Sequence, residues 1–141
     1  MINDARSKLQ DGYKRLISFE TQSGGYEWFG QAPGHEALTG YGLLQFTEIK
    51  EVTPSGTVSD DMIQRVSEWL KSRRDGDGGF KVNEKSLDTF GYANMNVTNA
   101  YLVWVLSSLG YTDLNQEFKS LAAFLTSNDD PYILSLFALT L

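Results

Sequence analysis

The strongest constraint on the fold is a short turn motif that occurs twice, each time between two segments with helical periodicity. The motifs Gly24–Tyr26 and Gly78–Phe80 begin 54 residues apart, and the same offset brings Leu16 into register with Leu70. A third copy is degenerate, because it keeps an aromatic residue, Tyr132, but has lost both glycines. The repeating unit is therefore helix, Gly-Gly-aromatic turn, loop and helix. Repeated helix pairs of this kind predict either a solenoid or a closed ring of helical hairpins.

Six segments have the spacing of apolar residues that is typical of amphipathic helices. We expect helices over about 3–21, 35–48, 60–74, 97–109, 114–126 and from about 130 onward. The expected helix-initiating residues are Asn3 or Asp4, Ser59, Asn96, Asp113, and Asp130 followed by Pro131. No segment shows strand alternation, so the prediction is an all-α domain over 1–141, with hairpin repeats at about 3–48, 59–109 and 113–141.

Composition excludes several classes of function. The chain has 141 residues, a net charge of −6 and no cysteine. The acidic balance disfavours nucleic acid as a partner, because phosphate binding requires clustered basic residues. The lack of cysteine excludes zinc-thiolate sites, cysteine nucleophiles and disulfides. No apolar run approaches the roughly 18 residues of a membrane-spanning helix. The last residues, "YILSLFALTL", keep a helical apolar pattern without a cap, so we expect a fragment of something longer.

The stretch Asp75–Glu84, "DGDGGFKVNE", resembles a ligand loop at first sight. As an EF-hand it fails, because Gly79 and Phe80 occupy positions five and six and Ser86 occupies position twelve. As a phosphate loop it fails, because no Lys-Ser or Lys-Thr pair follows the glycines. The favoured interpretation is a turn in which Gly78 and Gly79 adopt positive φ and Phe80 inserts into the hairpin.

The remaining candidate residues have structural interpretations that outweigh chemical ones. His35 and Glu36 begin a predicted helix, where capping is favoured over catalysis. Together with Trp28 and Phe29 they form a candidate contact rim. The acidic runs 59–61 and 127–130 resemble the acidic motifs of terpenoid cyclases, but aspartate is also favoured at helix starts. Asn96 begins a formal glycosylation sequon.

The ordered set of motifs resembles the thioester-containing (complement-like) domain of the alpha-2-macroglobulin and complement family. The resemblance is carried by "GGYEWFG", "PGHEALTGYGLLQF", "SEWLKSRRDGDGGF" and "VTNAYLVWVLSSLG". These runs match that family's helix, turn, Leu-Thr-Ala-Tyr helix, Trp-Leu helix, Asp-Gly-Gly-Phe turn and second Leu-Thr-Ala helix. The matching positions are Tyr13–Thr21, Gly24–Tyr26, Leu38–Tyr41, Trp69–Leu70, Asp77–Phe80 and Val97–Tyr101. The run Gly34–Thr39 is similar to the long bacterial-type members.

The resemblance implies an α/α toroid in which the second, fourth and sixth helices are inner and the others outer. This chain would supply about half of the ring. The family's reactive thioester comes from a Cys-Gly-Glu-Gln motif, which is absent here, and some members use a histidine in the segment corresponding to 82–95, which contains none. The resemblance therefore gives no catalytic, cofactor-binding or metal-binding residue in this chain.

The resemblance also implies a function, which we state as an expectation. The chain would be a non-catalytic helical domain whose parent is an exported or cell-surface endopeptidase inhibitor. Its partners would be other domains of the parent chain, and the parent would bind proteases. The uncovered helix edges predict self-association of the fragment. The alternatives are half of a terpenoid cyclase or prenyltransferase-like enzyme, and a plain protein-interaction module.

Overall fold

The computed structural model describes residues 2–83 and 93–141, and within these ranges it contains six helices and no strand longer than an isolated bridge. The helices are α1 (Ile2–Ile17), α2 (Glu36–Val52), α3 (Asp60–Ser72), α4 (Met95–Ser108), α5 (Asn115–Leu125) and α6 (Pro131–Ala138). The prediction of an all-α fold is confirmed, and every expected helical segment forms a helix.

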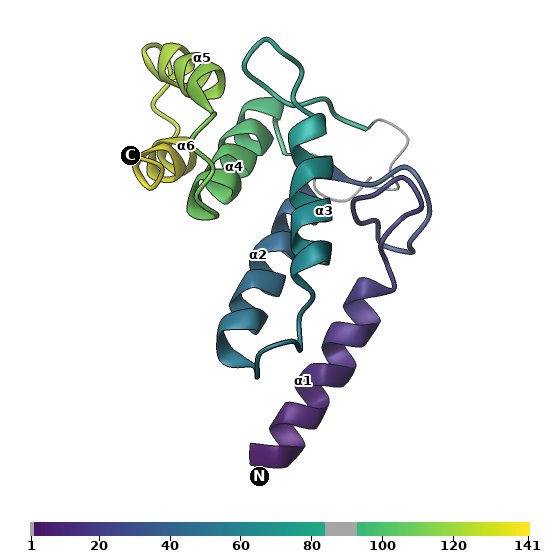
Figure 1. Ribbon diagram of the computed structural model, residues 1–141. Helices are drawn as coiled ribbons and strands as arrows, with labels where there is room; N and C mark the ends of the chain where they lie inside the picture. The colour runs from purple at the N-terminus through teal and green to yellow at the C-terminus, as the bar shows by residue number, and fades with distance from the viewer. Residues whose placement is uncertain (1, 84–92) are drawn as a thin grey trace.

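Helix α4 lies at the centre of the packing. It contacts α2 on one side and α6 on the other, so that α2, α4 and α6 form a row (Figure 1). Helix α3 packs against α2, and α5 packs against α4. Among the described residues the row contains many of the most buried positions, including Leu43 of α2, Leu102 and Val105 of α4 and Ile133 of α6, and α3 adds Val66 and Leu70. We call this row of even-numbered helices the inner row, which is the place that the resemblance implies for them, and the burial of α4 agrees with its apolar sequence.

Helix α1 is attached to the rest of the structure mainly through its C-terminal half. Its N-terminal end projects away from the other helices (Figure 1). Tyr13 is buried, and its ring meets the ring of Phe46 edge-on at 5.9 Å. The Tyr13 hydroxyl also accepts a hydrogen bond of 3.3 Å from the backbone N–H of Ser59. One aromatic side chain therefore joins α1 to α2 and to the start of α3.

The helix caps agree with the sequence prediction at two starts and differ at three others. At α1 the prediction of Asn3 or Asp4 was wrong, because both lie inside the helix, which begins at Ile2. The Oγ atom of Ser59 accepts from Met62 N at the start of α3, and Asp130 accepts from Tyr132 N and Ile133 N at the start of α6. At α4 the prediction of Asn96 was wrong, because Asn94 caps the helix by accepting from Asn96 N. At α5 the prediction of Asp113 was also wrong.

Asp113 is drawn away from its expected cap by a cation. Its carboxylate lies 3.2 Å from the Arg74 guanidinium, and its backbone oxygen accepts a second bond from the same side chain at 2.8 Å. Helix α5 then begins after Leu114 without a side-chain cap. A tertiary ion pair here outweighs the local preference of aspartate for a helix start.

The two glycine turns have the same backbone pairing, 54 residues apart. Thr21 N donates to Gly25 O at 2.9 Å in the first turn, and Asp75 N donates to Gly79 O at 3.0 Å in the second. In each turn a single antiparallel bridge leads to the aromatic residue, from Glu20 to Tyr26 in the first and from Arg74 to Phe80 in the second, and both rings are buried. The prediction that both rings insert into their hairpins is confirmed.

The glycines of the two turns are required for two different reasons. Gly24, Gly25 and Gly78 have φ between +73° and +95°, a region that is strained for residues with a Cβ atom. The expectation of positive φ at Gly79 was wrong. Gly79 is needed because a Cβ atom there would lie 2.8 Å from both the Asn99 amide and the Asp75 carboxylate.

Candidate functional site

The contact rim expected from the sequence is built on the first glycine turn. Trp28 and Phe29 follow the turn directly and are 51% and 72% exposed. His35 is the N-cap of α2, where its Nδ1 atom accepts a 3.2 Å hydrogen bond from Leu38 N. Glu36 is buried, and its Oε1 atom accepts a 2.7 Å hydrogen bond from Arg73. The two aromatic residues are therefore the part of this set that faces solvent.

A buried acid holds the aromatic pair in place. Glu27 is 2% exposed, and its Oε2 atom accepts from the backbone N–H of Phe29 at 2.8 Å and of Gln31 at 3.4 Å. These bonds close the backbone around the carboxylate, so the side chains of Trp28 and Phe29 are directed outward. A carboxylate that accepts hydrogen bonds from backbone N–H groups two and four residues later stabilises the local turn.

A cavity of about 230 Å³ opens beside the rim, between the end of α1, the first turn and α2. Almost all of its surface is apolar, and five of its ten lining residues are aromatic. The lining residues are Leu16, Phe19, Tyr26, Glu27, Trp28, Leu38, Tyr41, Gly42, Gln45 and Phe46. The cavity and the rim share Trp28, so together they form one continuous surface, which we call the aromatic notch.

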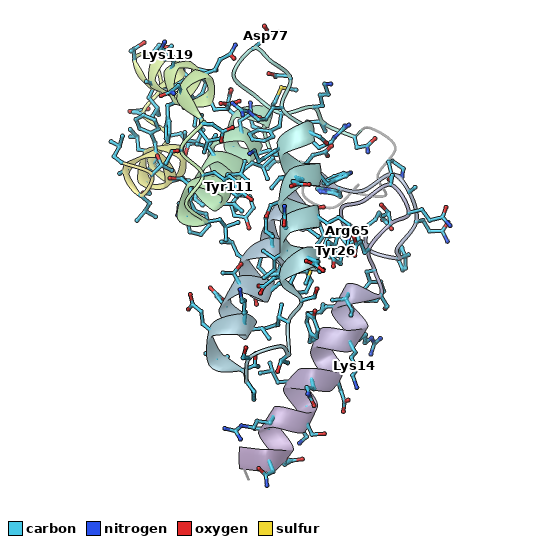
Figure 2. The ribbon with its side chains drawn as sticks, in the orientation of Figure 1. Lys14, Tyr26, Arg65, Asp77, Tyr111 and Lys119 are labelled. Carbon is cyan, nitrogen blue, oxygen red and sulfur yellow. The ribbon has the colours of Figure 1, made fainter. Side chains whose placement is uncertain are left out.

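The aromatic notch contains two buried polar atoms without a hydrogen-bond partner among the described residues. They are Oε1 of Glu27 and the hydroxyl of Tyr26. Burial, together with the nearby Glu20 carboxylate, raises the pKa of the Tyr26 hydroxyl above its ordinary value. Figure 2 places Tyr26 beside Arg65 of α3, which pairs with Glu20 through two hydrogen bonds of 2.8 Å. An unpaired buried polar atom is costly, so these two atoms are the unusual feature of the notch.

The acidic glycine loop uses its first aspartate to hold its own backbone. Oδ1 of Asp75 accepts from Asp77 N at 2.7 Å and from Gly79 N at 2.9 Å. Asp77 itself lies at the tip of the loop, away from the helices (Figure 2). Phe80 N then donates to the Asn99 side chain at 3.1 Å, which fastens the turn to α4. The loop is thus a hairpin turn, as predicted.

Two buried carboxylates join successive hairpins. Glu117 of α5 is 1% exposed and receives two hydrogen bonds from Arg74, at 2.6 and 2.8 Å. Glu36 of α2 receives one from Arg73 and a second from the backbone N–H of Asn83 at 3.2 Å. Hydrogen bonding to Glu117 raises the pKa of Arg74 above its already high ordinary value. These pairs hold the hairpins in register.

The acidic runs at 59–61 and 127–130 occupy helix starts. Asp60 pairs with Lys50, and Asp130 caps α6. Across residues 2–83 and 93–141, no three His, Asp or Glu side chains lie close enough together to hold a metal ion. The segment 82–95, which contains no histidine, lies partly outside the described residues.

A second aromatic surface lies on the inner row of helices. Tyr41 of α2, Tyr101 of α4 and Tyr132 of α6 line an open cleft of about 330 Å³. Burial, with the neighbouring Tyr132 and Tyr41, raises the pKa of Tyr101 to about 12. A high phenol pKa keeps this side chain neutral through the physiological range.

The sequence led us to propose Trp28, Phe29, His35 and Glu36 as a contact rim. Of these, Trp28 and Phe29 face solvent and Glu36 is buried, and most of the notch was missed. Leu16, Tyr41 and Gln45 come from two helices and are brought together only by tertiary packing. The only feature of the sequence that could have indicated the notch is Glu27, an acidic residue between aromatic residues directly after a glycine turn. A buried charge in such a segment points to a specific set of partners.

Comparisons with known proteins agree with the architecture. A family model described as the A-macroglobulin TED domain matches residues 1–132. No curated protein matches the chain. No helix within the described residues is long and apolar enough to cross a membrane.

Proposed function

The chain belongs to the A-macroglobulin TED domain family, and from this membership we propose that it acts as a non-catalytic helical domain of a longer, macroglobulin-type endopeptidase inhibitor. That family's domain is an all-α toroid. The inner row of α2, α4 and α6 with α3 and α5 packed beside it supports an arc of that toroid, amounting to about half a ring.

The observation that carries the proposal is the family match across residues 1–132 in a sequence without a single cysteine. A thioester needs a cysteine thiol, so these 141 residues cannot form one. The side chains that could have served chemistry have structural partners instead. His35 caps α2, Glu36 binds Arg73, and Asp75 holds its own loop. We therefore propose that the chain contributes a helical scaffold and contact surfaces to a protease inhibitor, and no reactive group.

Inhibition by the full-length protein tests the proposal. The full-length protein, in molar excess, is incubated with an endopeptidase, and digestion of a large protein substrate is then followed. We expect digestion to be blocked, whereas residues 1–141 alone neither block it nor cleave the substrate. Unimpaired digestion by endopeptidases of several specificities at tenfold excess of the full-length protein contradicts the proposal.

The enzymatic alternative, a terpenoid cyclase or prenyltransferase-like half-toroid, requires acidic residues gathered around a central cavity. Asp60 and Asp130 instead lie at the starts of α3 and α6, and neither lines either of the two cavities described above. This arrangement favours the inhibitor domain over the enzyme. Incubation with isoprenoid diphosphates and magnesium, with product analysis, distinguishes the two.

The remaining partner and location proposals follow from the family and from the surface. An exported or cell-surface location is the one in which macroglobulin-type inhibitors meet proteases. We further propose self-association of residues 1–141, and the motive for it is the exposed leucines at the C-terminal edge, Leu134, Leu139 and Leu141. Light scattering across a concentration series measures it, and a mass that stays monomeric throughout contradicts it.

A further inference from the structure

We propose that the aromatic notch is a binding site for the side chain of a lysine presented by a protein partner. The site lies between the end of α1, the first glycine turn and α2. The lysine stem fills the apolar cavity, and its ammonium group meets the carboxylate of Glu27. The proposal does not rest on protease inhibition by the full-length protein.

The walls of the notch favour an organic cation over a neutral apolar group. Phe19, Tyr26, Trp28, Tyr41 and Phe46 all line the cavity. Aromatic rings attract an ammonium group through the negative potential of their faces, and clusters of such rings around a cation recur in cation-binding sites. The net charge of −6 adds a long-range attraction for basic partners.

Glu27 supplies the acceptor that such a cation needs. Its Oε2 atom is occupied by two backbone N–H groups, whereas its Oε1 atom has no partner among the described residues. A single free oxygen suits the point charge of an ammonium group, because a guanidinium prefers two parallel acceptors. Since Oε1 is covered in this conformation, the proposal requires a wall residue to rotate before the ammonium reaches it, and Trp28 is the half-exposed residue beside Glu27.

The size of the cavity indicates one side chain rather than a free ligand. At about 230 Å³ it is smaller than the roughly 300–1,000 Å³ of pockets that enclose small molecules. The apolar stem of a lysine suits the almost wholly apolar wall of the notch, and its charged end would meet the covered carboxylate of Glu27. Phe29 and Trp28 at the rim supply exposed apolar surface that the partner's backbone and neighbouring residues would cover.

Nuclear magnetic resonance titration of the isotope-labelled chain with Nα-acetyl-lysine methylamide tests the proposal. We expect saturable shifts at the amides of Phe29 and Gln31, because both donate to the Glu27 carboxylate. The norleucine analogue, which lacks the ammonium, should bind at least about tenfold more weakly, given the strength of hydrogen bonds to charged groups. The arginine analogue should bind more weakly than lysine.

Variants separate binding at the notch from general attraction to an acidic protein. Glu27→Gln should weaken lysine binding about tenfold, whereas Glu51→Gln, the same charge change at an exposed position on α2, should leave it unchanged. Trp28→Ala, at a half-exposed position, should weaken binding about threefold and provides the test if Glu27→Gln does not fold. Equal binding of norleucine, tighter binding of arginine, shifts confined to other surfaces, or no saturable shift overturns the proposal.

Discussion

Replacement of Arg74 by methionine should strongly destabilise the fold, because it leaves a buried carboxylate without its counter-charge. Glu117 is 1% exposed and is held by two Arg74 hydrogen bonds of 2.6 and 2.8 Å. Removal of one partner from a buried ion pair costs about 3–5 kcal/mol of unfolding free energy. The same variant also frees the backbone oxygen of Asp113, which Arg74 now binds at 2.8 Å.

The chain provides a matched control at the equivalent position of the preceding repeat. Arg74 and Glu20 are 54 residues apart in sequence, and Glu20 pairs with Arg65 of the next odd-numbered helix, as Arg74 pairs with Glu117 of α5. The charges are exchanged, because the acid Glu20 stands where the later repeat has the base Arg74, and the two ion pairs differ in how deeply they are buried. The Arg65 side chain is 54% exposed and that of Glu20 is 18% exposed. Arg65→Met should therefore cost only about 1 kcal/mol or less.

Urea unfolding followed by far-ultraviolet circular dichroism at neutral pH gives the free energies for both variants. Because a loss of 3–5 kcal/mol can approach the whole stability of a small domain, Arg74→Lys provides a milder variant that keeps the charge but loses the two-point geometry. The double variant Arg74→Met/Glu117→Leu should recover most of the loss, because neither charge remains. If Arg74→Met costs no more than Arg65→Met, the assignment of Glu117 as a buried link between hairpins is refuted.

Three further perturbations test other parts of the structure. Gly25→Ala should lower the free energy of unfolding by about 3 kcal/mol, because it combines positive φ with a Cβ atom 2.7 Å from the Trp69 ring. Gly56→Ala is the control, since it has positive φ but open space, and it should cost about 1 kcal/mol in the same urea assay. Equal costs for the two variants would contradict the packing argument. Between pH 10 and about 12 the free energy of unfolding should fall, because the folded chain keeps the proton on Tyr101 whereas the unfolded chain loses it. Tyr101→Phe should make that fall smaller when unfolding is measured across this pH range. An unchanged fall in the variant would refute Tyr101 as the cause. Asp130→Ala should cost about 1 kcal/mol by removing two cap bonds of α6, and unchanged thermal unfolding would argue against that cap.

The sequence was sufficient for the helices and for the two turns, because both depend on local rules. Helical periodicity, Ser59 at a helix start and Pro131 in a first turn act within a few residues of the chain. The glycine turns could be recognised for the same reason, since left-handed backbone at Gly24 and Gly78 is a local property.

Most of the parts that the sequence could not predict depend on partners distant along the chain, and the cap of α4, which is Asn94 rather than Asn96, is a local exception. Asp113 has the residue type and position of a helix cap, and only the fold brings Arg74 to it. Glu36 has the position of an exposed first-turn acid, but Arg73 and the backbone of Asn83 enclose it. The cavity beside Trp28 exists because the ends of α1 and α2 converge there. Burial of a charge cannot be inferred from a helical pattern when its partner is some forty residues away.

The central claim is that this chain contributes structure and surface, but no chemistry, to a protease inhibitor. The most direct test measures protease inhibition by a variant of the full-length protein. The variant carries four substitutions together: His35→Asn, Asp60→Asn, Asp61→Asn and Asp129→Asn. Asparagine at position 35 keeps an acceptor for the α2 cap, so the fold should persist. The account predicts that this variant blocks digestion of a protein substrate as well as the unmodified protein does. A tenfold or greater loss of inhibition at unchanged thermal stability would contradict it.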